Sequence, residues 1–147
     1  MCDAAGGYRN MVRVCSSIGL VLAACAVVVG CGQSDDRDEV RGVAALFAAA
    51  LADGDGASAC AQLAPATVEA LERQERRPCA EAIGALGVGG GAVEQVRVYV
   101  TNAQAVFGGG EVAFLDRRRA GWRLSAVGCR FEDGKPRDRP ATCAVES

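Results

Sequence analysis

An apolar segment near the N-terminus limits which part of this 147-residue chain can belong to a folded domain. The segment spans residues 14–29, follows two arginines and is followed by the small residue Gly30. A basic start, an apolar centre and a small residue at the end are typical of a secretory signal. A membrane-spanning helix is the alternative, but it needs ~20 clearly apolar residues, and this run is shorter. We therefore expect residues 1–30 to be a signal peptide, with Met11 as the more suitable start.

The four residues at the boundary where this segment ends, Val28-Val29-Gly30-Cys31, resemble the bacterial lipobox. The resemblance implies cleavage before Cys31, a diacylglycerol thioether on its sulfur and acylation of the new amine, with palmitate among the acyl chains. Each buried CH₂ contributes about 0.8 kcal/mol, and two or more chains hold a protein on a bilayer stably. The expected location is the extracytoplasmic face of the cell membrane, with a lipid anchor as the membrane contact. The alternative is an ordinary secreted protein that is cut at a nearby small residue.

Four further cysteines lie in the part that would be exported: Cys60, Cys79, Cys129 and Cys143. An even number in an exported domain indicates two disulfides. Four cysteines allow three connectivities. Short loops favour Cys60–Cys79 and Cys129–Cys143, each worth ~3 kcal/mol in the chain-entropy model. A structural zinc site brings cysteines in closely spaced pairs such as C-x₂-C, and this spacing is absent, so no metal site is expected.

The composition narrows the chemistry that is open to the chain. It contains no histidine, which excludes Ser-His-Asp and Cys-His catalysis and histidine metal ligands. The formal charge is −2, and residues 31–147 carry 14 basic and 17 acidic side chains, so their charge is −3. A nucleic-acid partner is therefore not expected. The run Gly87–Gly91 lacks the preceding strand and the following helix of a phosphate-binding loop, and we expect no cofactor.

Hydrophobic periodicity divides the exported part into a helical half and a strand half. Apolar residues at helical spacing predict an amphipathic helix over residues 40–52, with Asp35 or Asp36 as its cap. The polar residues 31–39 before it are expected to be a lipidated tether, and residues 40–147 a single domain. Shorter helices are expected at residues 57–64, 65–74 and 78–86, before the glycine run ends the helical half.

After the glycine run the period changes to two, which is typical of strands. Val96, Val98 and Val100 alternate with polar neighbours. We expect four antiparallel strands, at residues 93–101, 103–107, 111–116 and 122–130. The loop before the last strand carries Arg117-Arg118-Arg119, which is expected to be a solvated tip. Contact with anionic lipid headgroups, at ~1 kcal/mol per basic residue, is the alternative for these arginines.

Helices followed by an antiparallel meander give an α+β layout. Three segments, VRGVAALFAAALADGDGASAC, CAEAI and GWRLSAVGC, resemble the nuclear transport factor two-like superfamily in its small exported actinobacterial form. The resemblance covers residues 38–146 and implies a cone, in which a curved four-stranded sheet wraps around the N-terminal helices and leaves an apolar pocket at its open end. The simpler interpretations are that Trp122 anchors the core and that Tyr99 lies at the rim. The candidates to line the pocket are Phe47, Tyr99, Phe114 and Trp122.

This superfamily contains isomerases and dehydratases as well as non-catalytic lipoproteins, so the resemblance alone does not fix a function. We expect a non-catalytic domain that binds a small apolar ligand or an envelope protein. The alternatives are a His-free isomerase- or dehydratase-like enzyme and a structural envelope component. A carboxylate buried in the pocket near Tyr99 would favour the enzyme. We expect none of the six carboxylates outside caps, tethers and turns to be buried there: Glu69, Glu72, Glu81, Glu94, Glu111 and Asp116.

Overall fold

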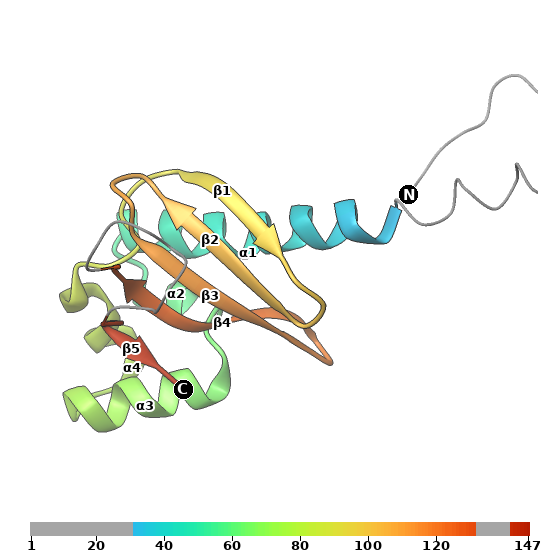
Figure 1. The fold of residues 1–147 in the computed structure, drawn as a ribbon. Coiled ribbons are helices and arrows are strands. Elements are labelled where there is room, and N and C mark those ends of the chain that lie inside the picture. Colours follow the sequence, from blue (N-terminus) through green and yellow to red (C-terminus); the bar gives the residue numbers. More distant parts are fainter. Residues whose placement is uncertain (1–30, 132–141) are drawn as a thin grey trace, which may run out of the picture. The chain divides into compact units, whose positions relative to one another are not determined.

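The computed structural model describes residues 31–131 and 142–147 (Figure 1). The signal peptide expected at residues 1–30 lies outside the described residues, as does most of the segment that follows the last predicted strand. The chain from Gly32 to Ser147 belongs to one compact unit, so its helices and strands form one domain.

The first helix is longer than the sequence predicts. Helix α1 (Cys31–Ala52) includes residues 32–39, which were expected to form an extended tether. Asp35 and Asp36 therefore lie inside the helix and do not cap it. Further along, the apolar stripe of residues 40–52 is buried as the periodicity predicts, with Val40, Ala44 and Phe47 each 0% exposed.

The remaining helices are short, and local residues explain where two of them begin. They are α2 (Gly56–Cys60), α3 (Pro65–Glu75), α4 (Cys79–Ala82) and the 3₁₀ helix η2 (Ile83–Leu86). Asp55 caps α2, because its carboxylate accepts hydrogen bonds from the hydroxyl and the backbone N–H of Ser58. These bonds favour the charged form and lower the pKa of Asp55. Pro65 occupies the first turn of α3, where its missing N–H costs nothing.

Both expected disulfides are confirmed. Cys60 is bonded to Cys79, and Cys129 is bonded to Cys143. The first bond joins the end of α2 to the start of α4. Its local geometry also depends on Gly56, since a side chain there would overlap the carbonyl oxygen of Ala80. The second bond joins the end of the fourth strand to the C-terminal segment.

Within the described residues the sheet has five strands, not the four that the sequence predicts. They are β1 (Val93–Val98), β2 (Asn102–Phe107), β3 (Val112–Arg118), β4 (Gly121–Cys129) and β5 (Val145–Glu146), and they follow one another in this order across an antiparallel sheet. The fifth strand is two residues long and pairs with β4. A strand this short has no detectable alternation of its own, which explains why the sequence did not reveal it.

The first strand ends earlier than expected. β1 stops at Val98, and the backbone N–H of Tyr99 donates a hydrogen bond of 2.7 Å to the carbonyl of Asn102, which closes a tight turn. Val100, which was expected to continue the strand, therefore lies in the turn and is 89% exposed.

The side chains of β4 do not alternate strictly between the two faces of the sheet. Leu124 pairs with Leu115 and Ala126 pairs with Phe114, so Ser125 is an extra residue on β4. Such a bulge moves the following side chains to the other face. Val127 thus lies in the core beside the helices, and Ala126, which strict alternation from Trp122 and Leu124 would place there, packs on the opposite face.

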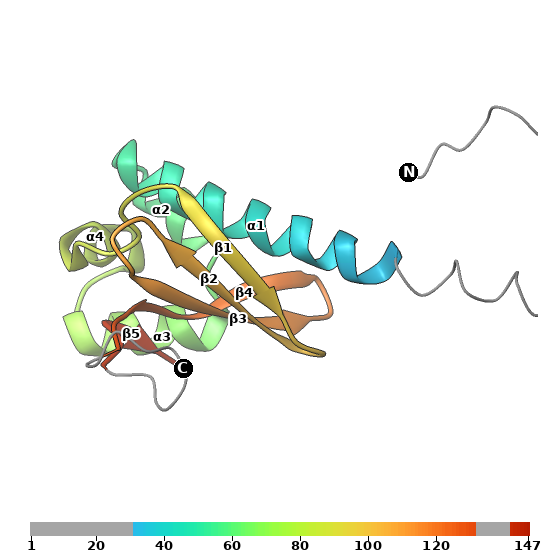
Figure 2. The same ribbon diagram turned by 45° about the horizontal axis from the view of Figure 1, so that its top comes forward.

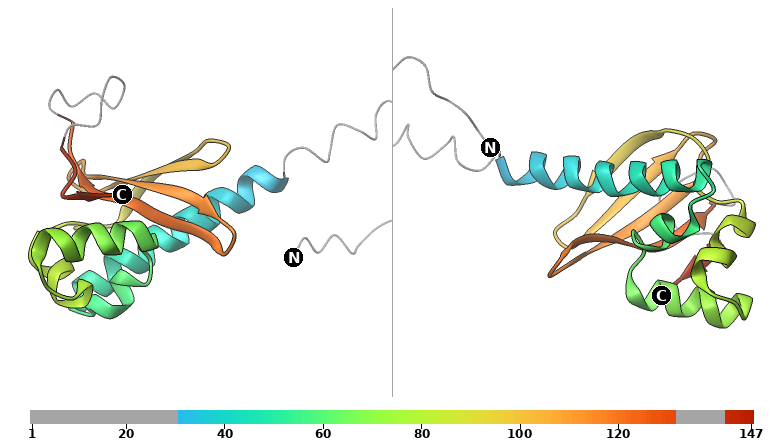
Figure 3. Two further views of the ribbon diagram at one scale, coloured as in Figure 1. Left: turned by 90° about the horizontal axis from the view of Figure 1, so that it is seen from below. Right: turned by 180° about the vertical axis from the view of Figure 1, so that it is seen from behind.

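The helices and the sheet form an α+β domain, but the sheet is not strongly curled (Figures 2 and 3). The described helices lie on one face of the sheet, seen best in the left view of Figure 3. Fully buried side chains from α1 and from the strands fill the space between these two layers, among them Phe47, Phe107, Leu115 and Trp122. The expected cone-like curvature is therefore corrected to a flatter sheet that packs against helices on one side.

Candidate functional site

The structure does not bring the four predicted pocket residues together. Phe47 and Trp122 are both 0% exposed and belong to the core between the helices and the sheet. Phe114 is half-buried on the opposite face of the sheet, beside Val112 and Ala126. Tyr99 is 59% exposed in the turn between β1 and β2. Their positions make Phe47 and Trp122 packing residues.

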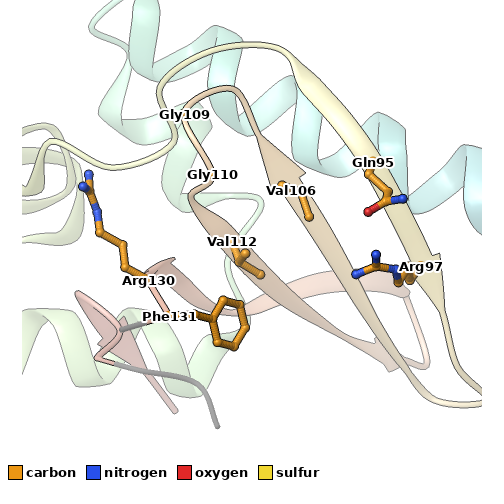
Figure 4. Close-up of a pocket in the computed structure, with 8 residues that line it drawn as sticks. All are labelled: Gln95, Arg97, Val106, Gly109, Gly110, Val112, Arg130 and Phe131. Carbon is orange, nitrogen blue, oxygen red and sulfur yellow. The ribbon is translucent and has the colours of Figure 1, made fainter. Parts of the chain in front are cut away.

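A hollow of about 390 Å³ lies on the face of the sheet that the helices leave uncovered (Figure 4). This volume is at the small end of the ~300–1,000 Å³ that small-molecule sites occupy. Each of the first three strands contributes to it, together with the turn between β2 and β3 and the two residues after β4. The residues that line it are Gln95, Arg97, Val106, Gly109, Gly110, Val112, Arg130 and Phe131.

The floor of the hollow is apolar. Val106 from β2, Val112 from β3 and Phe131 after β4 belong to a second hydrophobic cluster, separate from the main core. The bonded cysteines Cys129 and Cys143 belong to the same cluster, and β4 has two bulges between Leu124 and Cys129. Val106 and Phe131 are only half-buried, so they offer apolar surface to a ligand at this place.

The hollow also carries positive charge at its edges. Arg97 on β1 extends over the sheet, and Arg130 lies at the other end, where its guanidinium points away from Phe131 (Figure 4). Gln95 is the third polar residue, and the described lining residues include no carboxylate. Chemically, such a site can combine apolar contact with hydrogen bonds to an anionic group.

Arg97 is held in place by a buried partner. Its Nη1 donates a hydrogen bond of 3.1 Å to Oε1 of Gln104, which is 6% exposed and faces it across the pairing of β1 and β2. Sequence reasoning missed this pair. Arg97 looked like one of several outward residues of a strand, and the position of Gln104 on the same face follows only from the register.

The arginine-rich tip between β3 and β4 is partly engaged with α1. Arg117 forms an ion pair with Asp36, and its guanidinium lies 5.5 Å from the centroid of the Trp122 ring. Asp36 also accepts from Nε1 of Trp122 at 3.4 Å, and Glu39 accepts from the backbone N–H of Trp122 at 3.1 Å. All three arginines of the tip are exposed, as expected of a solvated tip, and Arg117 in addition joins the sheet to the first turns of α1.

One of the six carboxylates considered, Glu111, is buried, although not in the hollow. Glu111 is 6% exposed, and its Oε1 accepts a hydrogen bond of 2.5 Å from the backbone N–H of Gly89. It thereby holds the glycine run against the start of β3. Glu111 does not line the hollow, and the length of β2 separates it from Tyr99. Its contact thus gives it a structural role and no partner for acid–base chemistry near Tyr99.

Two classes of feature are absent from the part of the chain that the structure describes. Within residues 31–131 and 142–147, no three His, Cys, Asp or Glu side chains gather closely enough to hold a metal ion. No helix in these ranges is both long and apolar enough to cross a membrane.

Comparison of the chain with family models, with curated proteins and with solved structures found no match.

Proposed function

We propose that this chain is an exported lipoprotein, anchored through Cys31 at the extracytoplasmic face of the cell membrane, whose domain binds a small ligand and does not catalyse a reaction. The observation that carries the binding part is the hollow on the open face of the sheet, where an apolar floor lies beside Arg97 and its buried partner Gln104. Pockets with apolar walls and a few fixed polar groups are typical of ligand sites.

The anchor part rests on the lipobox-like residues Val28-Val29-Gly30-Cys31. α1 begins at Cys31, so a lipid on this residue would be joined directly to a helix of the domain. At ~1.5 Å per residue, the eight residues 32–39 span ~12 Å as a helix, where an extended tether would span under ~30 Å. The start of α1 and the tip between β3 and β4 lie at the same end of the domain, and that end would face the bilayer (Figures 1 and 3).

Kinship with the nuclear transport factor two-like superfamily is part of the same proposal. The order of elements supports it, because helices precede an antiparallel meander in which each strand pairs with the next. The flatter sheet and the additional β5 depart from the expected cone. In this proposal the ligand site therefore lies on the face of the sheet opposite the helices, and not inside a cone as the resemblance implies.

The enzymatic alternative receives less support than binding. An isomerase-like site needs an acid and a base within reach of one substrate. The described residues around the hollow are arginines, a glutamine, glycines and apolar residues, which suit binding better than proton transfer. Glu111 is engaged with Gly89, and Tyr99 lies in an exposed turn.

Lipidation at Cys31 is tested by labelling cells with an alkyne analogue of palmitate. The native chain is expected to incorporate the label, and Cys31→Ala is expected to lose all of it, whether the variant is released or kept as an uncleaved precursor. Cys25→Ala, within the apolar segment, is the matched control and should be labelled like the native chain. Label on Cys31→Ala, or none on the native chain, would contradict the anchor.

A further inference from the structure

We infer that the hollow on the open sheet face binds a small amphipathic anion, with the apolar part of the ligand on Val106, Val112 and Phe131 and its carboxylate or phosphate group on Arg97. The inference rests on the proposed ligand-binding function and names the class of ligand. Three features of the described residues carry it: the charge of the lining, the way in which Arg97 is held, and the shape of the floor.

The charge of the lining selects an anion. Arg97 and Arg130 are the only charged residues among the described residues that line the hollow. A cationic ligand would be repelled by the two arginines, and a neutral ligand would form no ion pair with either of them. Arginine is also the side chain that binds carboxylate and phosphate groups best, because its planar guanidinium can donate two parallel hydrogen bonds.

Arg97 is better placed than Arg130 to bind the anionic group of the ligand. A guanidinium has five N–H donors, and the bond to Gln104 uses one of them while it fixes the orientation of the side chain. Because Gln104 is itself buried, the entropy cost of ordering Arg97 is met when the protein folds and not when the ligand binds. Arg130, by contrast, is exposed and points away from the floor (Figure 4).

The floor limits the apolar part of the ligand to a short body. Val106, Val112 and Phe131 lie between Arg97 and Arg130 in Figure 4. A volume of about 390 Å³ accommodates a short alkyl chain or a single ring system. A ligand whose anionic head group binds Arg97, and whose short apolar tail lies across the three apolar residues, therefore fits the hollow.

The test is an NMR titration of the domain Gly32–Ser147, which holds the described core and both disulfides. The probes are octanoate, octyl phosphate, octanol and octylammonium, which share one tail and differ in the head. Because Arg97 is half-exposed, we expect the better of the two anions to bind about tenfold more tightly than octanol. Amide shifts should be centred on β1, β2 and β3 around the hollow.

Variants assign the head group to Arg97. Arg97→Gln is expected to remove the preference for the anion and leave the weak binding of octanol, and Arg97→Lys to keep part of the preference. Arg73→Gln removes the same charge from an exposed position on α3 and should keep the full preference. Tighter binding of either anion, lost in Arg97→Gln, supports the inference.

Three results would overturn it. Equal binding of octanoate, octyl phosphate and octanol would remove the anion from the inference and leave a purely apolar site. Loss of the preference in Arg130→Gln but not in Arg97→Gln would show that the head group binds Arg130 and not Arg97. Shifts that stay outside the hollow with all four probes would contradict the proposed binding site itself, whereas the palmitate label on Cys31 tests the anchor independently.

Discussion

Replacement of Trp122 by alanine is expected to destabilise the domain by about 4 kcal/mol, within the ~3–5 kcal/mol that buried Trp→Ala changes cost. The side chain is 0% exposed and packs in the main core. Its indole N–H also donates to Asp36, and the guanidinium of Arg117 lies against its ring. The change therefore leaves a cavity and removes a contact between α1 and the tip of the sheet.

The loss can be measured by urea unfolding followed by far-ultraviolet circular dichroism, because the variant lacks the only tryptophan. With an m-value of ~2 kcal/mol per molar urea, the midpoint should fall by ~2 M. Tyr99→Ala is the matched aromatic control in an exposed turn and should change the free energy of unfolding by no more than ~0.5 kcal/mol. A loss below ~1 kcal/mol for Trp122→Ala would contradict its role as the anchor of the core.

Removal of the bond between Cys60 and Cys79 is expected to cost about 3 kcal/mol. The two cysteines are 19 residues apart, and the bond restricts the unfolded chain between α2 and α4. It matters more in this domain than in a larger protein, since both helices are a single turn long and have little stability of their own.

The double variant Cys60→Ala/Cys79→Ala avoids a free thiol and should unfold at ~1.5 M less urea, for an m-value of ~2 kcal/mol per molar. Reduction of the native chain opens both disulfides and should lower the midpoint further than the double variant does. A midpoint unchanged from the native chain would show that local packing, and not this bond, holds α2 and α4 together.

The sequence predicted those parts of the fold that depend on local patterns. The apolar stripe of α1 over residues 40–52 and the alternation around Val96 and Val98 gave the correct element types, because burial of one face imposes a period. The disulfides were also predictable, since four cysteines with two short spacings leave few connectivities. These features share the property that their causes lie within about twenty residues.

The errors arose where a distant partner decides the structure. Residues 32–39 looked like a tether because they are polar, yet Asp36 and Glu39 have partners more than eighty residues away at Arg117 and Trp122. Glu111 begins the predicted strand at residues 111–116, and its burial follows from the hydrogen bond that it accepts from the N–H of Gly89. No local pattern can reveal such contacts, which depend on the complete arrangement of the sheet and the helices.

The candidate site was missed for a similar reason. The predicted pocket followed from an implied cone, whereas the hollow lies on the other face of a flatter sheet. A bulge at Ser125 turns Ala126 toward that face, and the register of β1 and β2 sets Gln104 beside Arg97. The one signal that the sequence carried was the outward position of Arg97 between Val96 and Val98.

The measurement that tests the proposed lipoprotein most directly is the intact mass of the native chain purified from membranes. The account predicts a chain that begins at Cys31, is heavier by a diacylglycerol and an amide-linked acyl chain, and contains two disulfides. An unmodified Cys31, or a mature chain that begins at another residue, would contradict it.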